Sequence, residues 1–269
     1  MNAKETAEWY LTAAKNKVSV KASKTLVLGV LAGLFIGFAG LASTAASATV
    51  ESPSIAKLIS ALVFPAGLAM VVTTGAELFT GDCLLIIGVL QREIRVLQTV
   101  KTLITVYIGN FIGSVMVSLL AYFGKIFDNY KTQMAASVIK SASAKMCMGF
   151  LPMFVLGIGC NILVCIAVWM SFGASSVGGK ICAVFFPIMT FVVCGFEHSV
   201  ANMYYLSAGL LAKTNPDYLA AASELGIDYS NLTLSNALLY NLLPVTLGNI
   251  LGGMVFVGLL YWFVYLSKH

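Results

Sequence analysis

The sequence predicts an all-α membrane protein that crosses the bilayer six times. Hydrophobic residues make up 59% of the 269-residue chain and charged residues only 10%, whereas a soluble domain carries about 25% charged residues. Six apolar stretches are each long enough for the roughly 20 residues that span a hydrocarbon core. They are continuous runs, which a membrane β-barrel with its alternating pattern does not show. The stretches cover residues 25–45, 58–90, 101–124, 148–172, 181–212 and 236–265.

The two halves of the chain, about 25–125 and 146–266, repeat each other. The shared motifs are Phe64-Pro65 with Phe186-Pro187, Gly75-Ala76-Glu77-Leu78 with Gly195-Phe196-Glu197-His198, and a Gly-Asn-x-x-Gly pattern at Gly109–Gly113 and Gly248–Gly252. Each half has three spans, an odd number, so the second half enters the membrane from the opposite side. Inverted repeats of this kind place a substrate path at the midplane, lined by broken helices.

Glycine and acidic residues interrupt the second and fifth stretches, which predicts a break in each helix. Broken backbone is tolerated in a bilayer only where protein or a cavity surrounds it. The N-termini of half-helices carry positive partial charge and free N–H groups, which suit anions. Gly81 permits a sharp turn, and we expect Asp82 to cap the half-helix that follows.

Lysine and arginine residues set the expected orientation. Ten of them fall on the side of the two termini and six on the other, so we expect both termini in the cytoplasm and the chain in the cell membrane. The first group is Lys4, Lys15, Lys17, Lys21, Lys24, Arg92, Arg95, Lys101, Lys180 and Lys268, and the second is Lys57, Lys125, Lys131, Lys140, Lys145 and Lys213. Residues 1–24 then form a cytoplasmic segment and residues 25–266 a single channel domain. The loop 213–235 lies outside.

The N-terminal segment has two interpretations. Residues 3–20 can form a short helix on the membrane surface, with Trp9 and Tyr10 at the interface as amphipathic aromatic side chains. The alternative is a flexible tail.

The motifs at the two breaks resemble the signatures of the formate/nitrite transporter family. The likeness covers nearly the whole chain and is carried by Gly75–Gly81, by Gly195–Met203, and by Asn161–Cys165 with Trp169-Met170. The resemblance implies an aquaporin-like protomer, a homopentamer in which each protomer has its own pore, and small anions as substrates: formate, nitrite and hydrosulfide.

The resemblance also implies roles for individual residues. Apolar constrictions correspond to Phe64, Leu68, Leu78 and Phe191, and a wall position to Val164. A loop threonine corresponds to Thr80, a pore histidine to His198, and an asparagine near it to Asn249. Basic residues that draw anions to the pore correspond to Lys21 and Lys145. Asp82 departs from the family, in which many members have asparagine there.

Two of these assignments have alternatives. An unperturbed histidine titrates at about pH 6.5, so His198 is a candidate to exchange a proton with a passing weak base, or it is a buried neutral imidazole. Glu77 and Glu197 are either proton carriers or braces that accept hydrogen bonds from loop amides, and we favour braces.

The sequence therefore predicts a channel for the small monovalent anions of weak acids. Overall likeness favours hydrosulfide over formate or nitrite, and proton-coupled transport is an alternative to passive flow. A neutral-solute channel of the aquaporin class lacks support, because the only Asn-Pro, Asn215-Pro216, lies in a polar loop. No His-Glu-x-x-His, Gly-x-Ser-x-Gly or Cys-x-x-Cys motif occurs, so we expect no enzyme, cofactor or metal. The basic residues lie between apolar runs, which argues against nucleic acid as a partner.

Overall fold

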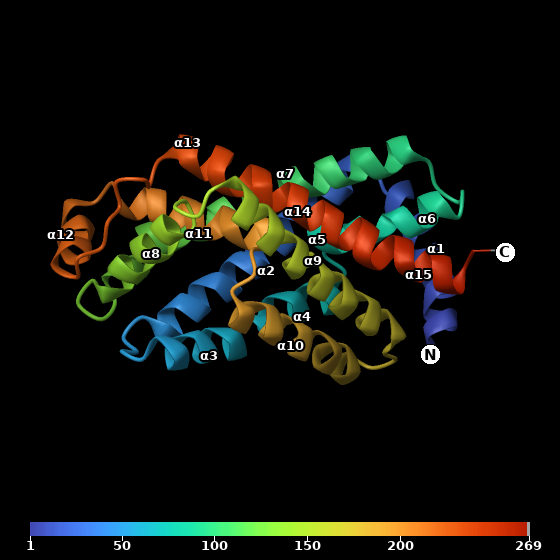
Figure 1. The fold of residues 1–269 in the computed structure, drawn as a ribbon, viewed down its shortest axis with the longest axis horizontal. Helices are drawn as coiled ribbons and strands as arrows, with labels where there is room; N and C mark the ends of the chain where they lie inside the picture. Colours follow the sequence, from blue (N-terminus) through green and yellow to red (C-terminus); the bar gives the residue numbers. More distant parts are fainter. Residues whose placement is uncertain (268–269) are drawn as a thin grey trace.

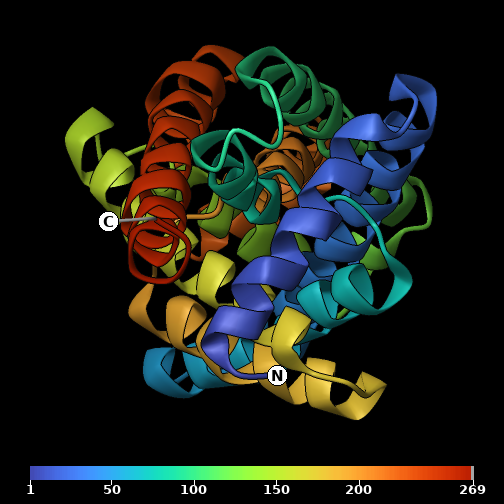
Figure 2. The same ribbon diagram turned by 90° about the vertical axis from the view of Figure 1, so that its right-hand side faces the viewer.

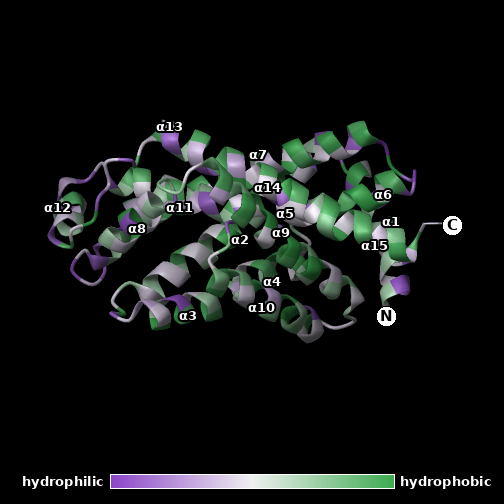
Figure 3. Cartoon of the chain, viewed as in Figure 1, coloured by the Kyte–Doolittle hydropathy of each residue, from purple (hydrophilic) through white to green (hydrophobic). Residues whose placement is uncertain are grey.

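The computed structural model describes residues 1–267, so Lys268 lies outside the described residues. Long helices run along the length of the molecule (Figure 1). Helices α1 and α15 lie at one end, and α8 and α12 lie at the other (Figure 1). Hydrophobic residues dominate the long helices, and hydrophilic ones gather in the loops around α12 (Figure 3).

The first half contains α1 (Ala3–Ser19), α2 (Ala22–Ser47), α3 (Pro53–Val63), α4 (Pro65–Thr74), α5 (Phe79–Asp82), η1 (Cys83–Leu85), α6 (Ile86–Leu90), α7 (Val96–Phe123), η2 (Ile126–Asp128) and α8 (Gln133–Ala144). The second half contains α9 (Phe150–Gly173), α10 (Val177–Cys194), α11 (Ser199–Ala212), α12 (Pro216–Glu224), α13 (Leu234–Asn236), η3 (Ala237–Leu242), α14 (Leu243–Gly253), η4 (Met254–Leu259) and α15 (Leu260–Tyr265). The segments η3 and η4 are π-helical.

The six predicted spans are confirmed as helices long and apolar enough to cross a membrane. They are Ala22–Ser47, Pro53–Thr74, Val96–Phe123, Phe150–Gly173, Val177–Cys194 and Leu234–Tyr265. The loop 213–235 is not entirely irregular, because α12 lies within it.

Both predicted breaks are present and share one geometry. Helix α4 ends at Gly75 with φ of 77°, and α10 ends at Gly195 with φ of 75°. A side chain at such angles is strained, so glycine is the favoured residue. The amide that follows each glycine then closes back on the helix, from Ala76 to the Val71 carbonyl and from Phe196 to the Phe191 carbonyl. This is the hydrogen bond of a Schellman helix end.

The inverted repeat is also visible in the helix pairs, because α2 packs on α7 as α9 packs on α14. Glycines of the repeated Gly-Asn-x-x-Gly motif permit the close contact. A Cβ atom on Gly113 would lie 2.1 Å from the Val30 carbonyl oxygen, and one on Gly248 would lie 2.1 Å from that of Phe154. Small residues at membrane helix interfaces allow backbones to approach in this way.

Of the two interpretations of the N-terminal segment, the structure has the helix and not the flexible tail, but the expected position of Tyr10 at the membrane interface is wrong. Tyr10 is 1% exposed. Its ring packs edge-on against Phe172 at 5.1 Å and near Trp169 at 6.3 Å, both on α9. Trp9 is 53% exposed. Helix α1 therefore rests on the helical bundle itself, across the end of the molecule shown in Figure 2.

The helix contact at Gly113 generates a prediction about stability. We expect Gly113→Ala to destabilise the folded protein by about 1–3 kcal/mol, because the new methyl group meets backbone that cannot yield easily. The thermal midpoint in detergent measures this. Gly178→Ala is the matched control, since a Cβ there meets nothing within 4 Å. Equal midpoints for the two variants would contradict the packing.

The docking of α1 generates a second prediction. We expect Tyr10→Ala to loosen the segment 1–24 and speed its cleavage by added protease, because loss of a buried aromatic ring costs about 3 kcal/mol or more. Tyr10→Phe should match the unmodified chain, since the Tyr10 hydroxyl has no hydrogen-bond partner among the described residues. If the alanine variant is cleaved no faster than the phenylalanine variant, the docking is wrong.

Candidate functional site

Two cavities enter the protein from its opposite ends. The α1-side vestibule, of about 530 Å³, is lined by Tyr10 and Lys17 of α1, by the first break and by α9. The α8-side vestibule, of about 300 Å³, is lined by the second break, by α3 and by the end of α8. No residue lines both cavities. The vestibules therefore approach one another across a closed stretch of protein.

Thr80 and His198 join the two breaks at the centre of the molecule. Both side chains are buried, and Thr80 Oγ1 lies 2.8 Å from His198 Nε2. His198 is also the N-cap of α11, because its Nδ1 accepts a hydrogen bond from the Ala201 amide at 3.1 Å. A neutral imidazole has one N–H. With Nδ1 accepting, that N–H is Nε2–H, and it donates to Thr80 Oγ1.

The five residues expected at constrictions fall into three groups. Phe64 and Phe191 line the α8-side vestibule and meet edge-on at 5.6 Å. Leu78 lines the α1-side vestibule. Leu68 and Val164 line neither vestibule and are each 2% exposed, in the buried cluster that also contains the other three.

Among the described residues, the side chain of Asn249 bonds to backbone groups and not to the imidazole of His198. Its Oδ1 accepts from the Ser199 amide at 2.9 Å, and its Nδ2 donates to the carbonyls of Gly157 and Glu197 at 2.8 and 3.0 Å. It therefore braces the second break. The first break has the same brace, Asn110, whose side chain binds Phe79 N, Gly29 O and Glu77 O at 2.9, 2.8 and 2.9 Å. Sequence reasoning missed the role of Asn110, although the repeated Gly-Asn-x-x-Gly motif contained the signal.

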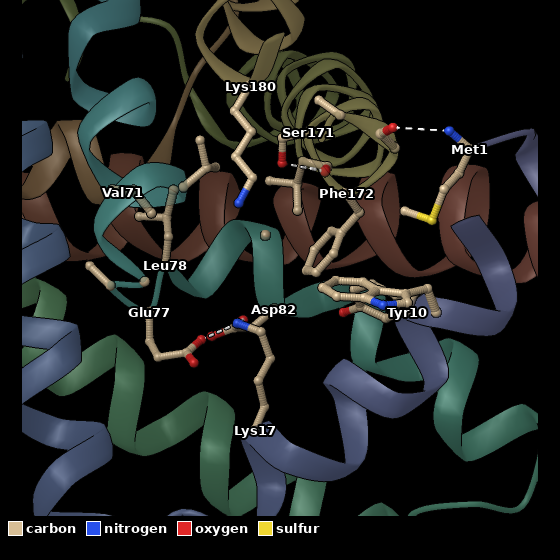
Figure 4. Close-up of a pocket in the computed structure, with 18 of the residues that line it drawn as sticks. Met1, Tyr10, Lys17, Val71, Glu77, Leu78, Asp82, Ser171, Phe172 and Lys180 are labelled. Atoms are coloured by element: carbon tan, nitrogen blue, oxygen red, sulfur yellow. Dashed lines mark hydrogen bonds and ion pairs between the residues drawn. The ribbon is translucent and has the colours of Figure 1, made fainter. Parts of the chain in front are cut away.

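Within residues 1–267, the carboxylates of Glu77 and Glu197 accept no hydrogen bond from a loop amide, so the predicted mode of bracing is wrong. Each carboxylate pairs with a lysine instead. Lys145 Nζ contacts both oxygens of Glu197 at 2.8 and 2.9 Å. Asn202 Nδ2 adds a bond to Glu197 at 2.6 Å. Glu77 forms an ion pair with Lys17 (Figure 4).

From the sequence, Asp82 is expected to cap the half-helix that follows the first break, and this expectation is wrong. Helix α5 begins at Phe79 after Leu78, and Asp82 is its last residue. Asp82 Oδ1 instead accepts from Lys17 Nζ at 2.7 Å. Its Oδ2 is buried and has no partner among the described residues.

The lysines that line the α1-side vestibule are Lys17 and Lys180, and the predicted Lys21 is not among them. Lys21 is exposed, precedes α2 and lines neither vestibule. Burial lowers the pKa of Lys17, but the carboxylates of Asp82 and Glu77 outweigh burial and raise it above its usual range. Lys17 therefore stays protonated. The spacing of Tyr10, Ala14 and Lys17 places them on one helix face. This pattern could have predicted that Lys17 points toward the protein together with Tyr10.

Lys145 lies where the sequence predicted a basic residue, in the α8-side vestibule. Its amino group sits 5.3 Å from the centre of the Tyr205 ring. The two vestibules thus have the same plan, with a lysine held against the glutamate of a braced break.

Comparison with known proteins assigns this architecture to a family. The family model described as formate/nitrite transporter matches residues 4–263. The chain is 35% identical over 250 residues to the formate channel FocA of Escherichia coli K12, covering 91% of this chain and 88% of that one. It is 32% identical over 266 residues to the formate channel BtFdhC of Bacillus thuringiensis, covering 98% and 95%.

Two solved structures share the fold. A pentameric formate channel with formate bound superposes with a TM-score of 0.81 at 35% identity, covering 91% of this chain and 98% of that one. An FNT family ion channel superposes with a TM-score of 0.82 at 29% identity, covering 97% and 98%. These relatives are channels, so the prediction that the chain is not an enzyme is confirmed. The chain belongs to the formate/nitrite transporter family.

Proposed function

We propose that the chain is a channel for formate and chemically similar monovalent anions, which pass from one vestibule to the other beside Thr80 and His198. The observation that carries the proposal is this buried hydrogen-bonded pair. His198 lines the α8-side vestibule, Thr80 directly precedes Gly81 of the α1-side vestibule, and both vestibules contain lysines. The named relatives that are formate channels support the choice of formate.

Thr80 is the residue that we expect to contact the anion. Its oxygen already accepts from His198 Nε2–H, and it has no other side-chain bond among the described residues. Its hydroxyl hydrogen is therefore free to donate to an anion in the closed stretch. Such a donor offsets part of the cost of removing an anion from water.

His198 acts in this proposal by orienting Thr80. A protonated imidazole would point an Nδ1–H at the Ala201 amide N–H, which now donates to Nδ1 at 3.1 Å. The two donors would oppose each other. This geometry favours the neutral imidazole, and it disfavours direct proton transfer from His198 to the substrate.

Apolar side chains on either side of the pair make the passage selective for small solutes. Phe64 and Phe191 close the α8 side, and Leu78 closes the α1 side. A hydrated anion loses water on entering such a slit, at a cost that grows with its charge. Small monovalent anions of weak acids are therefore the class that fits.

The proposed assembly is a homopentamer in a cell membrane with both termini in the cytoplasm. The pentameric relative supports the oligomer. Exposed apolar residues such as Ile104, Ile108 and Phe111 cover the outer face of α7, which suits contact with lipid or a neighbouring protomer.

Substitution of Thr80 tests the central contact. We expect Thr80→Val to lower formate flux into proteoliposomes at least about tenfold, because it removes a hydrogen bond to a charged group. Thr80→Ser keeps the hydroxyl and should retain most of the flux. Wild-type flux in the valine variant would show that the Thr80 hydroxyl does not serve the anion.

A comparison of uptake rates decides between the candidate anions. Uptake of formate, nitrite and hydrosulfide into proteoliposomes should be fastest for formate, with glycerol excluded. Hydrosulfide, which the sequence alone favoured, becomes the assignment if it leads. Passage of glycerol without anions would overturn the proposed function. If the interior of the vesicles acidifies in a fixed ratio to formate uptake, transport is proton-coupled.

A further inference from the structure

The two vestibules differ by one charge at equivalent positions of the repeat. Asp82 follows Glu77 by five residues, as Asn202 follows Glu197. Each lines its own vestibule and is 2% or less exposed. Each also has one buried oxygen without a partner among the described residues, Oδ2 of Asp82 and Oδ1 of Asn202. The positions match in structure, and the side chains differ by a negative charge.

The α8-side vestibule has one lysine more than it has carboxylates. Lys145 is matched by Glu197, and Asn202 is neutral. Lys57 is the second lysine, and no ion pair involving it occurs among the described residues. Its amino group points at the second break, because a Cβ atom on Gly195 would lie 2.8 Å from Lys57 Nζ. An entering anion therefore meets one uncompensated positive side chain.

The side-chain charges of the α1-side vestibule balance. Lys17 is shared by Glu77 and Asp82. Lys180 is the second lysine, and its amino group points into the cavity (Figure 4). The α-ammonium of Met1 is exposed and bonds the Gly173 carbonyl at 3.3 Å. With this group included, the linings of the two vestibules carry the same formal charge, and Asp82 is the one acidic group of the α1 side without a counterpart on the α8 side.

We infer that Asp82 weakens anion binding at the α1-side vestibule, so that the channel saturates from the α1 side at a higher anion concentration than it would with a neutral side chain at this position. The inference rests on the proposed function. A unit charge in a partly enclosed cavity changes the local concentration of a monovalent ion several-fold. Asp82 therefore affects anion binding from the α1 side. It acts through its charge in the vestibule and not through contact with Thr80 or His198.

Side-resolved uptake tests this inference. Right-side-out and inside-out membrane vesicles that contain the full chain are loaded from outside with labelled formate. Protease removal of a tag placed after α15, which lies at the same end of the molecule as α1 (Figure 1), reports which side faces out. We expect Asp82→Asn to lower the half-saturating formate concentration roughly threefold from the α1 side only. The isosteric change keeps the hydrogen bond from Lys17 available.

Two further variants serve as controls. Glu93→Gln removes a negative charge at the same end of the protein, from the exposed pair with Lys15, and should change nothing. Asn202→Asp adds a charge to the α8-side vestibule and should raise the half-saturating concentration from that side. If Asn202→Asp does not fold, because Asn202 also donates to Asn241, the comparison of Asp82→Asn with Glu93→Gln decides alone.

The outcomes are distinct. An Asp82→Asn shift that is absent, or that is the same from both sides, overturns the inference. Absence of channel-dependent formate uptake in either type of vesicle overturns the proposed function instead. A one-sided shift with Asp82→Asn and none with Glu93→Gln supports the inference.

Discussion

The rest of this structure depends on satisfying the backbone groups exposed at two helix breaks inside a bilayer. Water is absent there, so every free amide and carbonyl needs a partner within the protein. Asn110 and Asn249 each supply one acceptor and two donor bonds, and each joins a break to a neighbouring helix. Because the breaks are held rigidly by these side chains, Thr80 and His198 can meet across the repeat axis at hydrogen-bond distance.

The charged groups are arranged around those braced breaks. In each half, a glutamate leaves the break toward a vestibule and is neutralised by a lysine from outside the pore helices. Lys145 comes from the end of α8, whereas Lys17 comes from α1. The lysine that pairs with the glutamate therefore comes from the channel domain in the α8-side vestibule and from the N-terminal segment in the α1-side vestibule. Both halves share this lysine–glutamate pair, and they differ in the charge of Asp82 and its equivalent Asn202.

Much of the fold was predictable because its causes are local. Long apolar runs determine the spans, and Gly75 and Gly195 determine the helix ends. The roles of Asn110 and Lys17 were harder, because their partners are distant in sequence: Asn110 binds residues 31 to 81 positions away, and Lys17 binds residues 60 and 65 positions away. Lys21 and Lys17 are both lysines near the end of α1, and only packing of the Tyr10 face against α9 decides which one enters the vestibule. Asp82 was expected as a cap because carboxylates commonly cap helices, but a nearby lysine offered a stronger partner.

The position of α1 has a consequence for how the protomer is assembled. This helix contacts α6, α7, α9 and α15, which come from both halves of the chain. The docking site of α1 is therefore complete only when the two halves of the repeat have packed together. Until α1 docks, Glu77 and Asp82 lack the Lys17 amino group that pairs with both of them. Packing of the two repeat halves is thus a condition for charge compensation at the first break.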